Sequence, residues 1–136
     1  MSWDVLIMKF SRPYQSMTEI PQEERSLPLG SRALVHERVL RQFPSTNWAD
    51  PAWGIWAGSA GSIEFSLGKD DPATSMMLHV RASNEVVALI VRLCTSNGWQ
   101  GIDCSSSEFL EHSNDPTRGL ASWAAYRDQV VRGSEP

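Results

Sequence analysis

Three ionisable residues whose side chains can cooperate in chemistry, Glu64, His79 and Arg81, lie on two segments with a strand-like pattern. In residues 62–67 and 75–82, alternate positions are apolar, and the three ionisable residues belong to the other set. A carboxylate beside an imidazole and a guanidinium can transfer protons or bind an anion. The alternative is a solvated sheet face with ordinary cross-strand ion pairs, and a register shift of one residue would separate the group. The sequence leaves both interpretations open.

No other pattern in the chain matches a catalytic or metal-binding motif. The histidines, His36, His79 and His112, are far apart, and no His-x-x-His or Cys-x-x-Cys pair occurs, so we expect no metal. The serines at 105–107 lack the Gly-x-Ser-x-Gly surroundings of a nucleophile elbow. The glycines in residues 54–61 lack the Lys-Ser/Thr ending of a phosphate-binding loop. The sequence therefore predicts no catalytic residue outside the first group and no cofactor.

Tryptophan is concentrated between residues 48 and 58, where Trp48, Trp53 and Trp56 supply half of the chain's six. Three indoles in a loop that enters a strand are hard to bury completely in a small domain. Indole is also enriched among the residues that dominate binding energy. Two interpretations follow: the segment covers one end of the core, or at least one of these tryptophans belongs to an interface.

The chain is mildly acidic, with a formal net charge of -4 and no run of lysine or arginine. Proteins that bind nucleic acids usually present a basic stripe, so we expect no nucleic-acid partner. Acidic residues in turns would instead steer a basic protein partner towards the tryptophans. The sequence therefore predicts a partner-binding surface formed by Trp48, Asp50, Trp53, Trp56, Asp70 and Asp71.

The periodicity of the sequence places these residues on a mixed fold. Alternation and short apolar runs predict strands at residues 5–10, 55–57, 62–67, 75–82 and 99–104. Helical spacing, with N-terminal capping signals and an Asn-Gly stop, predicts helices at residues 32–43, 85–96 and 116–131. The order β-α-β-β-β-α-β-α is typical of an α+β two-layer sandwich: a mostly antiparallel four- or five-stranded sheet with helices packed on one face. We expect the long connection, residues 11–30, to wrap around the surface.

A length of 136 residues and an even composition predict a single α+β domain, residues 1–136, with residues 111–136 as a C-terminal helical extension. The first residues carry an acid where a signal peptide carries positive charge. No segment reaches the roughly 18 apolar residues that span a membrane. Cys94 and Cys104 are expected to be free thiols. We therefore expect a cytoplasmic protein without a membrane partner.

Several short motifs follow one another along residues 1–110. They are MSWDV at residues 1–5, IP at 20–21, LGSR at 29–32, DPAWG at 50–54, IEF at 63–65 and LHVR at 78–81. In these motifs the chain resembles an uncharacterised family of small bacterial single-domain proteins that begin Met-Ser-Trp-Asp, whereas residues 111–136 have no counterpart. The family has no established activity, so the resemblance implies no catalytic role. By analogy, proteins of this size and type are similar to immunity proteins, which bind and neutralise a toxin made by the same bacterium.

Together, these observations indicate a non-catalytic protein-binding domain, most concretely an immunity-type inhibitor that neutralises a cognate bacterial toxin. The alternative is a small enzyme or ligand-binding domain that uses the open sheet face around Glu64, His79 and Arg81. That alternative predicts a concave pocket there, partly roofed by residues 11–30 or by the C-terminal helix. In a third interpretation the sheet face or the final helix is a homodimer surface, so the chain is expected to be a monomer or a homodimer.

Overall fold

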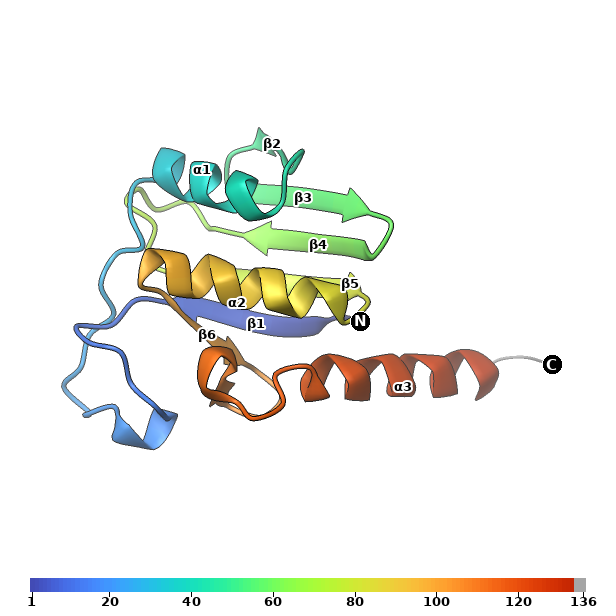
Figure 1. Cartoon of the computed structure of the whole chain (residues 1–136). Coiled ribbons are helices and arrows are strands. Elements are labelled where there is room, and N and C mark those ends of the chain that lie inside the picture. The colour runs from blue at the N-terminus through green and yellow to red at the C-terminus, as the bar shows by residue number, and fades with distance from the viewer. Residues whose placement is uncertain (134–136) are drawn as a thin grey trace.

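The strands of the protein form one antiparallel sheet, described for residues 1–133 in a computed structural model (Figure 1). Among these residues, seven strands pair in the order β2-β3-β4-β5-β1-β6-β7, and each pair is antiparallel. The strands are β1 (Trp3–Met8), β2 (Asn47–Asp50), β3 (Trp53–Gly58), β4 (Gly61–Ser66), β5 (Met76–Ala82), β6 (Gln100–Asp103) and β7 (Glu108–Phe109).

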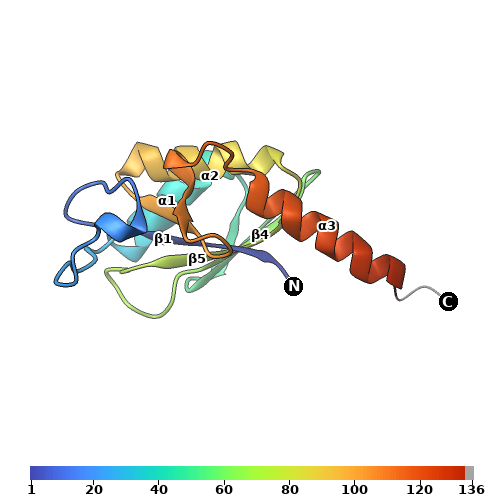
Figure 2. The same cartoon turned by 90° about the horizontal axis from the view of Figure 1, so that it is seen from below.

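Two helices lie side by side on one face of this sheet, and a third projects away from it (Figures 1 and 2). Helix α1 (Arg32–Gln42) is capped at its N-terminus by Ser31, whose hydroxyl accepts a hydrogen bond from the backbone N–H of Leu34. Helix α2 (Glu85–Asn97) ends at Gly98, which adopts the left-handed conformation that glycine favours at helix ends. Helix α3 (Arg118–Gly133) extends beyond the sheet.

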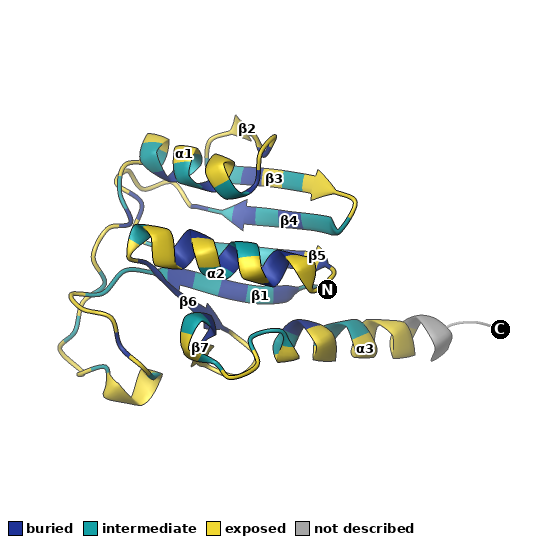
Figure 3. Ribbon diagram, viewed as in Figure 1, coloured by how far each residue is buried: buried dark blue, intermediate teal, exposed yellow. Residues whose placement is uncertain are grey.

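The main core lies between the sheet and helices α1 and α2. In β1 the side chains of Trp3, Val5 and Ile7 are buried, while those between them are only partly buried. Strands β4 and β5 show the same alternation, because successive side chains point to opposite faces of a sheet. Figure 3 shows the matching buried stripes on the two helices. These stripes consist of Val35, Val39, Val86, Val87, Ile90, Leu93 and Cys94. We call the face of the sheet opposite α1 and α2 the open face.

A second, smaller apolar cluster covers one end of the open face. Tyr14, from the long connection, packs with Ile102 of β6 and Phe109 of β7, and Leu6 lies against them. The backbone N–H of Tyr14 donates to Gln100 Oε1 (2.9 Å), and Gln100 Nε2 donates back to the Tyr14 carbonyl (2.8 Å). The connection, which includes the short 3-10 helix η1 (Met17–Glu19), therefore wraps around the surface as predicted.

The α+β class is confirmed, but the prediction of four or five strands is wrong. The two strands that the sequence did not indicate are β2 and β7, at the two edges of the sheet. Three of the four residues of β2 are exposed and the fourth is half-buried, so the strand has no buried apolar face to give a period of two. Strand β7 has two residues, too few for any periodicity, and passes directly into the 3-10 helix η2 (Leu110–His112). The predicted helices occur, with the last beginning at Arg118 rather than at residue 116.

Both cysteines are free thiols, Cys94 buried in the core and Cys104 exposed beyond β6. Burial raises the pKa of the Cys94 thiol well above its ordinary value, and Glu111 adds to this effect. Within the described part of the chain, no helix combines the length and the apolar character needed to cross a membrane.

Candidate functional site

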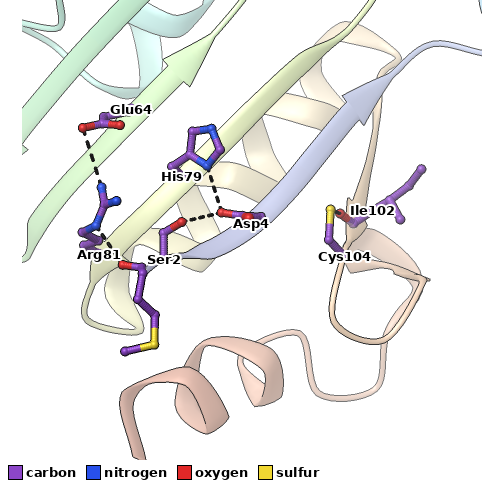
Figure 4. Close-up of polar contacts among 8 residues, drawn as sticks. Ser2, Asp4, Glu64, His79, Arg81, Ile102 and Cys104 are labelled. Carbon is purple, nitrogen blue, oxygen red and sulfur yellow. Dashed lines mark hydrogen bonds and ion pairs between the residues drawn. The ribbon is translucent and has the colours of Figure 1, made fainter. Parts of the chain in front are cut away.

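The register of three strands brings a row of ionisable side chains together on the open face. Glu64 of β4 lies opposite His79 of β5, and His79 in turn lies opposite Asp4 of β1. Arg81 is two residues further along β5 and therefore points to the same face. The structure thus groups the three residues of the predicted ligand-binding site, and it adds Asp4, which sequence reasoning missed (Figure 4).

His79 is the most constrained member of this row. Its Nδ1 lies 2.9 Å from Asp4 Oδ1, and because a carboxylate only accepts hydrogen bonds, Nδ1 carries the proton. The hydroxyl of Ser2 donates to the same Asp4 oxygen. The Trp53 ring stacks on the imidazole, with centroids 5.8 Å apart and planes 24° apart. The ring is therefore fixed by a carboxylate at one edge and by an indole on one face, and within the described residues Nε2 has no hydrogen-bond partner.

Glu64 and Arg81 form the other pair of the row. Arg81 Nη1 lies 3.6 Å from Glu64 Oε1, and Arg81 Nε donates to the Met1 carbonyl (2.8 Å). About a third or more of each of these two side chains is solvent-exposed. An exposed pair of this kind contributes roughly 0.2–1 kcal/mol to stability. The ionisable groups of the open face are thus paired with one another rather than aimed at one common point.

The three clustered tryptophans do not form one surface. Trp48 stacks on His36 of α1, with centroids 4.0 Å apart, and lies over Gly54, where any Cβ would come within 3 Å of the indole. Trp56 packs edge-on against Phe43, with centroids 5.3 Å apart. Both are on the helix side and are half-buried against the main core. Only Trp53 lies on the open face.

The predicted acidic residues also separate. Asp50 pairs with Trp53 across the β2–β3 turn, so it lies on the open face with the indole. Asp71 Oδ1 accepts from the Arg32 backbone N–H (3.0 Å), and it therefore stabilises the start of α1. Asp70 is exposed in the same β4–β5 connection. Of the six residues in the predicted partner-binding set, two, Asp50 and Trp53, therefore lie on the open face near His79.

Ile55 completes the open face and was also missed. It lies opposite Glu64 and is 48% exposed, which is high for a strand isoleucine. Its strand was predicted, but its orientation followed only from the pairing with β4. We define the open-face patch as Asp4, Asp50, Trp53, Ile55, Glu64, His79 and Arg81. Three carboxylates and one guanidinium make the patch acidic, with apolar area supplied by Trp53 and Ile55.

Two clefts border the patch where the sheet approaches α3. One, of about 400 Å³, is lined by Asp4 together with Trp3, Cys104 and Trp123. The other, of about 640 Å³, is lined by Arg81. Neither is lined by His79 or Glu64. The described residues also contain no group of three His, Cys, Asp or Glu side chains placed to hold a metal ion.

Comparison of the chain with models of known protein families, with curated proteins and with solved structures found no match.

Proposed function

We propose that the protein is a non-catalytic binding protein whose open-face patch docks a basic protein partner. The observation that supports this proposal best is the composition of the patch: an acidic, largely accessible sheet face with an isoleucine and a tryptophan. Its ionisable side chains already have partners within the chain, as the pairs Asp4–His79 and Glu64–Arg81 illustrate.

Docking suits this arrangement better than turnover does. Catalysis needs reacting groups that converge on one point, in a site from which water can be excluded. Here the paired groups lie along a strand row, and the neighbouring clefts lie at the margin of the patch. A protein interface instead needs apolar anchors surrounded by polar residues. Trp53 and Ile55 serve as the anchors, and Asp50 and Glu64 attract cationic groups of the partner during encounter.

In its most specific form, the proposal is an immunity-type inhibitor that acts in the cytoplasm and neutralises a basic toxin from the same bacterium. The resemblance to small bacterial proteins supports this form by analogy. The acidic character of the patch supports a basic surface on the toxin. Neutralisation would follow from occlusion, because a partner docked across this sheet face covers a broad area.

Co-expression tests the proposal directly. The toxin-like product of a neighbouring gene is produced with the wild-type chain or with the double variant Trp53→Ala/Ile55→Ala, and complex formation and rescue of growth are measured. We expect the variant to lose roughly thirtyfold or more in affinity, since truncation of a buried aromatic anchor costs about 2 kcal/mol or more. Leu40→Ala, on the exposed side of α1, is the matched control. The proposal fails if no neighbouring product binds, or if the double variant binds as tightly as the wild type and the Leu40→Ala control do.

One observation favours a small enzyme or ligand-binding domain as the second candidate. His79 is oriented through Nδ1 by Asp4, and its Nε2 is left for another group, as in a general base. This candidate requires the pure protein to bind or convert a small molecule with a strict dependence on the imidazole. A His79→Gln variant that keeps the partner affinity but loses such an activity would favour it over docking.

A further inference from the structure

Within residues 118–130, helix α3 is attached to the rest of the protein by its first turns. Leu120 is fully buried in the main core, and Gly119 lies so close to β6 that an added Cβ would be 2.1 Å from Asp103 Oδ2. From residue 125 to residue 130 every position is exposed. Figures 1 and 2 show the helix extending past the sheet as a projecting arm.

Between this arm and the rest of the protein lies the cleft of about 640 Å³ that Arg81 borders, which we call the α3 groove. Its helix wall consists mainly of Ala121, Ala124 and Ala125. The opposite wall includes Ala60 of the β3–β4 turn and Gly61 at the start of β4. Small side chains on both walls leave room for the backbone of another segment. From residue 121 to residue 128 the helix rises about 10 Å, the length of roughly three extended residues.

The residues that line the groove carry a net positive charge, whereas the whole chain carries a net negative charge. Arg81 lines it from the sheet and Arg127 from the helix, against one acidic lining residue, Asp128. Arg127 and Asp128 pair with each other at 3.1 Å on the exposed helix surface. The N-terminus of α2 also opens there: its N-cap residue Asn84 lines the groove and makes no side-chain capping bond. Glu85 in the first turn of α2 offsets the positive end of the helix dipole, so the groove offers an acidic segment its two guanidinium groups.

We propose that the α3 groove binds a short acidic segment of a protein partner. Carboxylates of that segment pair with Arg81 and Arg127, and its backbone lies between the alanine wall of α3 and the β3–β4 turn. A flat bilayer cannot enter a cleft bounded on both sides, so a peptide fits this site better than an anionic membrane does. The groove shares Arg81 with the open-face patch, where this side chain also lies near Glu64, but its other lining residues are separate, so the proposal does not rest on the function of the patch.

The test uses a fluorescent hexaglutamate peptide as the probe and follows its polarisation on titration with the full chain at low salt. Two variants act by different means: Arg127→Glu reverses a charge, and Ala125→Trp fills the groove from an exposed position. We expect each to weaken binding about tenfold, equivalent to about 1.4 kcal/mol. Arg41→Glu, which reverses an exposed arginine of α1, is the control and should bind like the wild type.

Loss of binding in both groove variants, with retention in Arg41→Glu, supports the proposal. It is overturned if the wild type does not bind the peptide, if Ala125→Trp binds normally, or if Arg41→Glu loses as much affinity as Arg127→Glu. It is also overturned if the chain sediments with phosphatidylserine vesicles while ignoring the peptide. Circular dichroism of each variant verifies that the fold is retained.

Discussion

At the scale of single residues, Glu24 fastens the long connection through hydrogen bonds to its carboxylate. The Ser11 backbone N–H (2.8 Å), the Ser11 hydroxyl (3.0 Å) and the Tyr14 hydroxyl (3.0 Å) all donate to it. The backbone bond from Ser11 is the largest of the effects that lower the pKa of Glu24 below its ordinary value. A lowered pKa in the folded state means that this stabilisation is present at neutral pH and is lost as the pH falls through that pKa.

We therefore expect Glu24→Gln to lower the urea midpoint at neutral pH. The difference from the wild type should shrink on acidification, because the protonated wild-type side chain loses the same interactions. Urea unfolding curves at several pH values measure this difference. Glu23→Gln, an exposed neighbour, is the control, and a difference that stays constant with pH would contradict the role assigned to Glu24.

The thiol of Cys104 provides a second test at the residue scale. Partial burial, followed by the charges of Asp4 and Asp103, raises its pKa above the ordinary value. Since the thiolate is the reactive form, we expect Cys104 to react with a disulfide reagent more slowly than glutathione does at neutral pH. Asp4→Asn should accelerate the reaction, because one of the two nearby negative charges is removed. A thiol that reacts as fast as glutathione, or is unchanged in the variant, would refute this assignment.

The candidate site shows what single residues reveal before a structure is known. Alternation alone placed Glu64, His79 and Arg81 on one face, and the strand register then brought them together. Alternation could not predict the positions of Trp48 and Trp53. Trp53 is placed by the β2–β3 pairing, and Trp48 lies over Gly54, where only a glycine leaves room for the indole. Asp4 was missed for a similar reason, since its contact with His79 spans 75 positions in the sequence.

At the scale of elements, Gly119 sets how closely α3 approaches β1 and β6. An added methyl group would lie 2.1 Å from Asp103 Oδ2 and 2.5 Å from Trp3 Nε1. Trp3 Nε1 already donates to Asp103 Oδ1 (3.1 Å), so the helix, rather than this buried pair, must move.

We expect Gly119→Ala to destabilise the protein by roughly 1–3 kcal/mol, as overpacking usually does. Ser122→Ala, at an exposed site of the same helix, should change stability by less than about 0.5 kcal/mol. Chemical denaturation compares the two variants, and equal stabilities would show that α3 is not anchored at Gly119.

The elements that the sequence predicted are those with a strong periodic signal of their own. Helices α1 and α2 combine apolar stripes with end signals, Ser31 at the start of one and Gly98 at the end of the other. The edge strands β2 and β7 lack such a signal, because β2 has no buried side chain and β7, although its Phe109 is buried, is only two residues long. Sheet order is equally non-local: β1 lies between β5 and β6, and no short stretch of sequence encodes that position.

At the scale of the whole molecule, the charges are unevenly distributed. The chain is acidic overall, yet residues 118–130 of α3 carry Arg118 and Arg127 against Asp128 alone. The open-face patch is acidic, whereas the α3 groove is basic. The two proposed surfaces therefore favour partners, or parts of one partner, of opposite charge. Because both surfaces are accessible to solvent, association at either should weaken as salt rises.

The two apolar clusters should unfold together, because β1 contributes side chains to both. Val5 and Ile7 lie in the main core, while Leu6 of the same strand packs in the cluster around Tyr14. Loss of β1 would therefore expose both clusters at once. Because one strand serves both clusters, we predict that the chain unfolds as a single domain, with one cooperative transition in urea.

Three probes test that cooperativity. Tryptophan fluorescence follows all six indoles, of which Trp3 and Trp99 are buried, and circular dichroism follows the backbone. Labelling of the buried Cys94 in a Cys104→Ser variant follows the opening of α2. We expect one common midpoint for the three. If Cys94 became reactive well before the fluorescence changed, α2 would be separable from the sheet, and the single-domain prediction would be wrong. Coincident curves would instead mean that the sheet, its two covering helices and the wrapped connection form one cooperative unit, from which only the projecting turns of α3 can loosen separately.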